Sequence, residues 1–356
     1  MKFIYLTLLC VAVSLTGCTS KPSDTASTGN SDAPSFSLAW SEYPSWSAFY
    51  VAHAQGLING DAGAMGPLEE KWGVDLVLKE ADYDSCLLFF GSNECDAVCI
   101  TNMDILSPSL SRDSVVILPT STSVGADACI VTGIETIDDL KGKSTYGLEM
   151  SVSQYCFERN LELLGKTIDD FPFKNMDPAV AAQAMQQGQA GIESIMVWNP
   201  FLMTTLRTRE DAKVLFDSST IPEEIIDMVV IGKDSLSKPG GENFACLVAD
   251  CFYEVCKLLE DPQTREESLV QLGEKFSNLE AEDMKIVVQQ TQFYKTPEDA
   301  LSLLNKEKFQ QEIMPMVVEF CQTHGIVDTK PTVGYDDDSA QLSFHTKFIE
   351  KIKTKQ

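Results

Sequence analysis

Short strand-like runs alternate with helix-like segments along the chain from Phe36 onward. The strand-like runs are rich in branched apolar residues, and the segments between them carry apolar residues at helical spacing. Repeated strand and helix units favour a mostly parallel sheet with helices on both faces. The strands expected in this first series are 36–40, 74–78, 96–100, 115–119 and 128–132, and the helices are 47–56, 83–91 and 103–109. The pattern therefore predicts an α/β protein.

A second series of strands and helices begins after the segment 137–142. Its expected strands are 144–149, 171–175, 192–198 and 212–216, with helices at 152–164 and 178–187. The strand expected at 227–232 returns to the first sheet, and from Gly240 the chain is mainly helical. The helices expected there are 242–260, 263–276, 280–290, 297–304 and 306–324.

This order of elements predicts two lobes, each with a mostly parallel sheet. A chain of 356 residues that is 44% hydrophobic is long enough to bury two cores. The first lobe would be discontinuous, formed by 36–134 and 225–356, and the second lobe, 135–224, would be inserted into it. The two crossings between the lobes are expected near 132–136 and 217–227.

The N-terminus carries export and anchoring signals. An apolar run from Phe3 to Leu15 follows Lys2 and has the length of a signal-peptide core. The run ends in Leu-Thr-Gly-Cys, which resembles a bacterial lipobox, so we expect residues 1–17 to be removed and Cys18 to be lipidated. A plain signal peptide is the alternative. Residues 18–35 are rich in Ser, Thr, Pro and Gly and predict a flexible tether. The folded body is therefore expected at the periplasmic or extracellular face of a membrane.

Charge and motif content exclude several function classes. Asp and Glu number 53 against 27 Lys and Arg, a formal net charge of -26, which repels nucleic acid phosphates. Nucleic acid is therefore not an expected partner. The chain has no G-x-S-x-G, phosphate-binding loop or H-E-x-x-H motif, and its 3 histidines have no evident acid or nucleophile partner. We expect no enzyme activity, no cofactor and no metal site.

The cysteines are expected to be buried and inert. Removal of Cys10 with the signal peptide and lipidation of Cys18 leave nine of the 11, an odd number. Cys95 and Cys99 would share a strand face but lie about 13 Å apart, too far for one bridge. Disulfide pairing cannot be assigned from these spacings.

Candidate ligand-binding residues gather where predicted strands end. In open parallel sheets, ligands bind beyond the carboxyl ends of the strands. Four such ends carry aromatic or polar side chains, which could form a wall for a small flat or cationic solute or plug the sheet as core. The candidate residues are Trp40, Tyr43, Trp46, Asn102, Asp104, Glu149, Ser151, Ser153, Trp198 and Asn199.

Glu149 stands at the expected junction of a strand and a helix. A helix start attracts anions, so Glu149 could be a counter-charge for the helix or an arm that reaches a cationic ligand. Ser151 and Gln154 fit a capping box that would cap the helix without help from Glu149. This favours a ligand contact for Glu149, while Asn102 and Asp104 could equally be helix caps.

Four stretches in order resemble a known family. They are "AWSEYPSWSAFYVAHAQGL" (39–57), "GSNECDAVCITNMD" (91–104), "LKGKSTYGLEMSVSQY" (140–155) and "VWNP" (197–200). Together with the lipobox, they resemble the substrate-binding lipoproteins of ABC importers in the nitrate, sulfonate, taurine and pyrimidine-precursor group. The segments 101–104 and 148–155 look most like binding proteins encoded beside urea carboxylase. One departure is Glu193, where related proteins commonly carry a "DA" pair after the glycine.

The resemblance implies a two-lobed periplasmic-binding-protein fold of type II that delivers a small solute to a permease and its ATPase. It implies pocket walls at Trp40, Tyr43, Trp46, Asp104, Glu149 and Trp198. The expected protein is a monomer held to the membrane by the lipid on Cys18.

The residue types favour guanidine, urea or a related amine or amide as the solute. Guanidinium pairs with carboxylates bidentately and stacks on aromatic rings, whereas an oxyanion would need Arg or Lys, which the four stretches do not place at the strand ends. The alternatives are taurine, an alkanesulfonate or nitrate, with the anion on the helix start at 151–153, or a pyrimidine thiamine precursor. An enzyme of pyrimidine synthesis on the same fold is a third hypothesis, and the lack of a Cys/His cluster argues against it.

Overall fold

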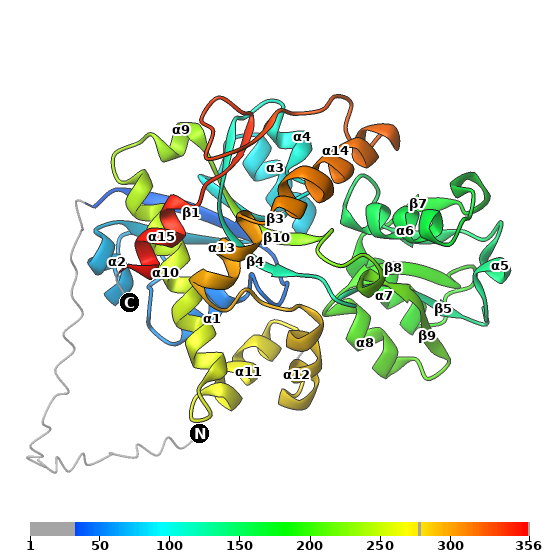
Figure 1. The fold of residues 1–356 in the computed structure, drawn as a ribbon. Coiled ribbons are helices and arrows are strands. Elements are labelled where there is room, and N and C mark those ends of the chain that lie inside the picture. Colours follow the sequence, from blue (N-terminus) through cyan, green and yellow to red (C-terminus); the bar gives the residue numbers. More distant parts are fainter. Residues whose placement is uncertain (1–32, 277–278, 355–356) are drawn as a thin grey trace, which may run out of the picture.

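The computed structural model describes residues 33–276 and 279–354. The signal peptide, Cys18 and almost all of the tether lie outside the described residues. The described part forms two lobes that lie side by side, with the inserted lobe in green and the remaining chain in the other lobe (Figure 1). None of the described helices is long and apolar enough to cross a membrane.

The first lobe is built on a seven-stranded sheet in the order β11-β12-β4-β10-β3-β1-β2. Its strands are β1 (Ser35–Trp40), β2 (Asp75–Glu80), β3 (Ala97–Thr101), β4 (Ser114–Thr122), β10 (Ile226–Gly232), β11 (Val333–Tyr335) and β12 (Leu342–Phe344). All nine residues of β4 and all seven of β10 are buried, because helices cover both faces of the sheet. Strands β11 and β12, which extend one edge, were not predicted from the sequence.

The second lobe is built on a five-stranded sheet in the order β7-β6-β8-β5-β9. Its strands are β5 (Asp127–Thr132), β6 (Thr145–Gly147), β7 (Phe173–Asn175), β8 (Ser194–Trp198) and β9 (Ala212–Asp217). Strand β6 ends at Gly147, two residues earlier than expected, and this places Glu149 in a turn rather than in the strand. A Cβ at Gly147 would lie 2.8 Å from the carbonyl oxygen of Met196, so only glycine lets β6 approach β8 this closely.

Both sheets are mixed, and the two crossing strands explain why. The chain leaves β4 at Thr122 and enters β5 at Asp127, so β5 begins at the boundary between the lobes and runs away from it. Strand β5 is therefore antiparallel to β8 and β9, and β10 is antiparallel to β3 and β4 for the same reason. The expected lobe boundary at 134 is wrong, because β5 belongs to the inserted lobe, and the first crossing is 123–126 rather than 132–136.

Most helices of the first lobe overlap the predicted ones, but those at Pro67–Trp72, Lys233–Leu236 and Lys347–Lys353 were not predicted. The helices of this lobe are α1 (Ala48–Ala54), α2 (Pro67–Trp72), α3 (Tyr83–Gly91), α4 (Leu106–Ser109), α9 (Lys233–Leu236), α10 (Gly241–Glu260), α11 (Arg265–Glu274), α12 (Ala281–Gln290), α13 (Pro297–Leu304), α14 (Met314–Thr323) and α15 (Lys347–Lys353). Helices α3 and α13 have the predicted bounds. The helix expected at 306–324 is present as continuous helical structure over 307–323, in which the π-helical segment η3 (Phe309–Ile313) precedes α14, whose second residue is a proline without a backbone N–H.

The inserted lobe carries the remaining helices on its own sheet. They are α5 (Ile137–Leu140), α6 (Val152–Leu163), α7 (Pro178–Gln186) and α8 (Phe201–Thr208), with the short 3-10 helices η1 (Ile168–Asp170) and η2 (Ser218–Thr220). Helix α6 begins at the boundary between the lobes, directly after the turn that contains Glu149.

A third connection joins the lobes besides the two crossings. After α12, the Tyr294 amide donates to the Thr120 carbonyl at 2.9 Å, and the Val124 amide donates to the Gln290 carbonyl at 2.7 Å. The Gln290 side chain accepts from Asn199 Nδ2 of the inserted lobe at 2.8 Å. Helix α12 of the first lobe therefore contacts both the first crossing and the second lobe.

The described cysteines behave as small core residues. All nine are buried, and no disulfide joins them. Burial raises the pKa of the Cys95 thiol to about 11 and that of Cys86 and Cys129 to about 12, so these thiols stay protonated at neutral pH. The prediction of buried, inert cysteines is confirmed for this part of the chain.

Candidate functional site

A small cavity lies between the two lobes, where strand ends, loops and the start of α6 converge. Its lining combines aromatic rings with carboxylates and comprises Tyr43, Trp46, Tyr83, Thr101, Asp127, Val152, Trp198 and Asp227. The space open to the centre of a water molecule is about 10 Å³, roughly the volume that holds a single water. In this closed arrangement the cavity leaves room only for a very small group.

Aromatic rings from both lobes form a continuous wall. Tyr43 and Trp46 have ring centroids 4.8 Å apart, and Trp46 stacks on Tyr83 at 5.3 Å with an interplanar angle of 21°. Tyr83 meets Trp198 of the inserted lobe edge to face, with centroids 5.6 Å apart. Trp46 Nε1 is buried and makes no hydrogen bond to a described residue, whereas the Tyr43 hydroxyl faces Asp227. The wall therefore offers ring faces and one unused polar group.

Asp104 lies behind this wall, three residues after the end of β3. Its Oδ2 accepts hydrogen bonds from the Tyr83 hydroxyl at 2.7 Å and from Thr101 Oγ1 at 2.8 Å. The Val152 amide, at the first turn of α6, is 3.4 Å from the same oxygen. Asp104 Oδ1 is buried with no partner among the described residues. Burial raises the pKa of Asp104 to about 6, although these hydrogen bonds act in the opposite direction.

Asp127 and Asp227 begin the two crossing strands. Ser123 Oγ donates to Asp127 Oδ2 at 2.6 Å, and Ser121 Oγ donates to Asp227 Oδ2 at 2.5 Å. Burial raises the pKa of Asp127 to about 7, and the charges of Asp104 and Asp217 add to the increase. The pKa of Asp227 is also raised, first by burial and then by the charge of Asp127. Carboxylates this deeply buried are costly unless a positive charge or a proton neutralises them.

The described lining of the cavity contains no Lys, Arg or His that could neutralise these acids. Asp104, Asp127 and Asp227 are nevertheless each at most 5% exposed. The described residues also contain no group of three or more His, Cys, Asp or Glu that could hold a metal ion. The arrangement is therefore suited to a ligand that brings N–H donors or positive charge.

A second acidic space, called the mouth below, adjoins the cavity. This outer space is lined by residues of both lobes, including Glu42, Asp82 and Asp84 of the first lobe and Asp177 of the second. It shares Tyr83 and Trp198 with the inner cavity, so this ring pair separates the two. Burial raises the pKa of Glu42, and the charges of Glu80, Asp177 and Asp82 raise it further. No basic residue lines this described mouth either.

Solved structures with the same architecture are numerous. The periplasmic aliphatic sulphonate binding protein SsuA from Escherichia coli matches with a TM-score of 0.65 and 17% identity, covering 83% of this chain and 89% of that chain. A Candida albicans gene product described as having the generic periplasmic binding protein fold matches with a TM-score of 0.58 and 14% identity, over 90% of this chain and 95% of that chain. This chain has the periplasmic binding protein fold.

A third structure of this fold is the ligand-binding component of an ABC-type import system from Staphylococcus aureus with zinc bound. It matches with a TM-score of 0.58 and 11% identity, covering 83% of this chain and 93% of that chain. No protein-family model and no curated protein match the chain. The predicted fold is confirmed; each sheet is mixed, with most strand pairs parallel in the first and half of them parallel in the second.

The start of α6 forms part of the cavity of this binding-protein fold, as expected. Ser151 is the N-cap, and its Oγ accepts from the Ser153 amide at 3.2 Å. Gln154 Oε1 accepts from the Met150 amide at 2.8 Å, one residue before the position that a capping box uses. The Ser153 side chain is fully buried and its hydroxyl has no partner among the described residues. Ser151 is thus a structural cap, whereas the Ser153 hydroxyl is unused.

Seven of the predicted site residues lie outside the cavity lining: Trp40, Asn102, Asp104, Glu149, Ser151, Ser153 and Asn199. Trp40 is buried against Tyr50, with their ring centroids 6.4 Å apart. Asn102 Oδ1 accepts from the Ile226 amide at 2.9 Å, and its Nδ2 donates to the Glu224 carbonyl at 3.0 Å, so Asn102 fixes the second crossing. Asn199 binds Gln290, as described above. Trp40, Asn102 and Asn199 are therefore structural residues in this arrangement.

Glu149, for which a ligand contact was expected, is also outside the lining of the cavity. The residue is exposed, and Met150 beside it has a φ of 57°, which turns the chain before α6 begins. Its backbone amide donates to Asn175 Oδ1 at 3.1 Å. Neither the lining of the inner cavity nor that of the mouth contains Glu149.

Tyr83, Asp127 and Asp227 were missed by the sequence argument. Asp127 and Asp227 stand at the start of apolar runs, and a parallel strand would place them far from the cleft. Only the reversed direction of the two crossing strands brings them to the boundary between the lobes. An acid at the beginning of each crossing strand is the signal that could have identified them.

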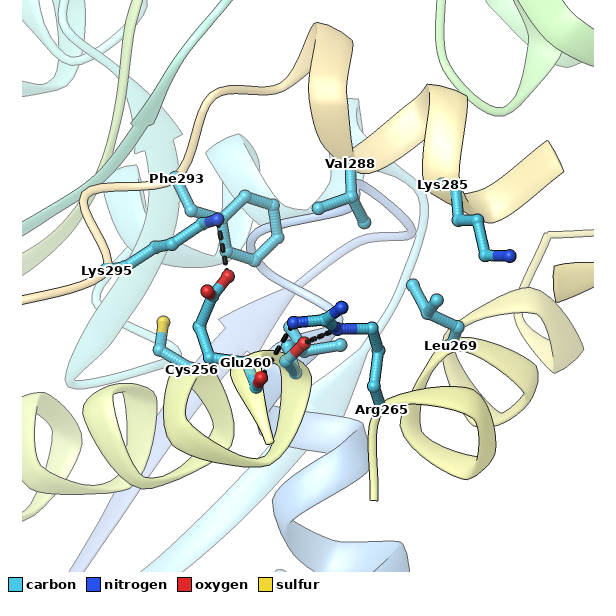
Figure 2. Close-up of a pocket in the computed structure, with 9 residues that line it drawn as sticks. Cys256, Glu260, Arg265, Leu269, Lys285, Val288, Phe293 and Lys295 are labelled. Atoms are coloured by element: carbon cyan, nitrogen blue, oxygen red, sulfur yellow. Dashed lines mark hydrogen bonds and ion pairs between the residues drawn. The ribbon is translucent and has the colours of Figure 1, made fainter. Parts of the chain in front are cut away.

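A separate cavity in the first lobe has a different character. It lies among α10, α11 and α12 and has a free volume of about 130 Å³ (Figure 2). Its charged residues are already satisfied: Lys295 pairs with Glu260 at 2.5 Å, and Arg265 donates to the carbonyls of Leu259 and Glu260 (Figure 2). This mostly apolar cavity is on one lobe only, so it is not the place where closing lobes would hold a solute.

Proposed function

We propose that this protein is the extracytoplasmic solute-binding component of an ABC importer, and that it captures a small nitrogen-rich solute such as guanidine or urea. The observation that carries the proposal is the set of three buried carboxylates, Asp104, Asp127 and Asp227, against an aromatic wall with no basic side chain in the described lining. The binding-protein fold supports the general role, and the acids support the class of solute.

Guanidinium matches this arrangement in shape and charge. Its planar fork of N–H donors pairs with carboxylates, and its face stacks on aromatic rings such as Trp46 and Trp198. Urea offers a similar plane with N–H donors and one carbonyl acceptor, which could use the free Trp46 Nε1 or Ser153 hydroxyl. The free volume holds about one water, so the cavity must widen to admit any of these solutes. Placement in the urea-carboxylase-associated subgroup is part of this proposal.

An anionic solute is the second candidate, because the structure from Escherichia coli is that of an aliphatic sulphonate binding protein. The first turn of α6, with the Ser153 amide and hydroxyl, would then hold the sulfonate oxygens. The buried acids oppose this, since an anion beside ionised carboxylates in a dry cavity is repelled. A pyrimidine would have to fit the same lining, and its ring would stack on the tryptophans.

A thermal-shift panel separates these candidates. Guanidine is expected to raise the melting temperature by about 5 °C when present at 100 times its dissociation constant, because such binding stabilises the fold by about 2.7 kcal/mol. Urea, agmatine, taurine, nitrate and a pyrimidine complete the panel. A shift with taurine or nitrate and none with guanidine or urea would overturn the nitrogen-rich proposal in favour of the anion.

Affinity for guanidinium is expected to rise with pH. The pKa values of Asp104 and Asp127 are raised to about 6 and about 7, so both acids carry protons in acid solution. A cation must displace those protons, and we therefore expect binding to be weaker by about tenfold or more at pH 5 than at pH 8. Calorimetry in two buffers of different ionisation enthalpy should show proton release. Neutral urea displaces no proton, so an affinity independent of pH would point to urea.

The remaining partners follow from the importer role. The protein would deliver its solute to a permease and its ATPase, held at the membrane by the lipid on Cys18 and acting as a monomer. The same role makes it a non-enzymatic protein. Metabolic labelling of the full chain with a fatty acid, compared with a Cys18→Ala variant, tests the anchor. Loss of label in the variant supports it, and label that persists contradicts it.

A further inference from the structure

The three buried acids do not belong to one lobe. Asp104 follows β3 and Asp227 lies in β10, both in the first lobe, whereas Asp127 begins β5 in the inserted lobe. Asp127 sits one position after the end of the first crossing, 123–126. Any opening of the lobes about the two crossings would therefore change the separation between Asp127 and the other two carboxylates.

The groups that act electrostatically on these acids are themselves acidic. The charges of Asp104 and Asp217 raise the pKa of Asp127. The charges of Asp127 and Asp104 raise that of Asp227. Tyr43, which faces Asp127 and Asp227, has its own pKa raised by burial and by both charges. Burial also raises the pKa values of Cys156 in α6 and Tyr294 after α12, so both groups stay neutral and provide no positive charge.

The mouth also has carboxylates from both lobes. Glu42 belongs to the first lobe, and Asp177 caps α7 of the second. The charge of Asp177 contributes to the raised pKa of Glu42. Carboxylates therefore oppose one another across the lobe boundary at two depths, and no described basic side chain lines either space.

We propose that Asp127 makes closure of the lobes depend on positive charge in the cavity. When Asp127 and the acids of the first lobe are ionised and the cavity holds no cation, closure brings like charges together in a desolvated space, and the open form is favoured. A cationic solute or a bound proton removes this opposition and lets the lobes close. The inference rests on the proposed function, because it assigns a charge-dependent role to the same cavity.

The dependence on pH has a definite sign. In the closed structure, the pKa values of Asp104 and Asp127 lie above the usual range of aspartate. An open cleft returns water to both groups and lowers these values, so closure takes up protons. Acid conditions therefore favour the closed form without any solute, and neutral to alkaline conditions favour the open form.

Small-angle X-ray scattering of the solute-free protein tests the proposal. The wild-type radius of gyration is expected to be smaller at pH 5 than at pH 8. Asp127→Asn, which keeps the shape of a protonated aspartate, is expected to stay compact at both values. Glu149→Gln removes one charge from the same lobe outside the cavity and is expected to follow the wild type. Asp227→Asn, the second cavity variant, should resemble Asp127→Asn.

The outcomes separate this inference from the proposed function. A wild-type radius that does not change between pH 5 and pH 8, or a change that Asp127→Asn and Asp227→Asn both retain, overturns the role of Asp127. These measurements contain no solute, so they do not depend on which compound binds. If guanidine and urea fail in the thermal-shift panel while the wild type still opens with pH and Asp127→Asn does not, the solute proposal fails and the charge dependence stands.

Discussion

Asparagine in place of Asp227 is expected to weaken guanidinium binding by about 100-fold. The carboxylate is 1% exposed, and removing one partner of a buried ion pair costs about 2–5 kcal/mol of binding free energy. Asparagine retains a side-chain oxygen that can accept from Ser121 Oγ, which now lies 2.5 Å from Asp227 Oδ2, so the fold should be preserved. Isothermal titration calorimetry at pH 8 would measure the change.

The matched control for this variant is Glu149→Gln. It removes the same unit of charge from an exposed position, and its affinity for guanidinium is expected to stay within about twofold of the wild type, since exposed charges are screened by salt. Equal loss in both variants would mean that the overall negative charge, rather than the buried acid, attracts the cation. Unchanged affinity in Asp227→Asn, or gain of taurine binding, would favour the anionic solute.

Replacing Arg112 with methionine is expected to lower the free energy of unfolding by about 3 kcal/mol. The guanidinium is 8% exposed and donates to the carbonyl oxygens of Phe90 and Cys95, both at 2.9 Å. It also pairs with Asp234 at 3.0 Å. Methionine fills a similar volume but removes the guanidinium donor from both buried carbonyls, of which Phe90 keeps the Asn93 amide as a donor at 3.1 Å. The melting temperature should fall by about 6 °C or more.

Scanning calorimetry is the suitable measurement for Arg112→Met, because urea and guanidinium are themselves candidate solutes and cannot serve as neutral denaturants. Lys257→Met is the control: Lys257 pairs with Glu254 at 2.7 Å on an exposed helix face, and such pairs contribute about 0.5 kcal/mol or less. A melting temperature for Arg112→Met that matches this control would show that water replaces the lost donors.

The order of strands and helices could be predicted because each buried strand is a continuous apolar run. Strand β10 is an example: its run was recognised and its return to the first sheet is confirmed. The direction of β5 and β10 could not be predicted the same way. Direction depends on where the chain crosses between lobes, and the apolar run at 128–132 has the same composition whichever sheet it joins.

Only part of the candidate site could be predicted from the sequence. Tyr43, Trp46 and Trp198 follow strand ends that do face the cleft, and the structure brings them to the cavity. Asp104 was also placed there and binds Tyr83 and Thr101 beside it. Glu149 was misplaced because β6 ends two residues early, and Asp127 was missed because a strand start was taken to lie far from the cleft.

The burial of all nine described cysteines has a practical consequence for measuring this protein in action. A maleimide dye reacts with exposed thiolates, and thiols whose pKa is raised by burial react slowly. A single cysteine placed by Glu149→Cys, on the exposed turn before α6, would therefore be modified selectively in the folded body. An environment-sensitive dye at that turn would convert movement of the two lobes into a fluorescence signal, and the protein into a sensor for its own solute.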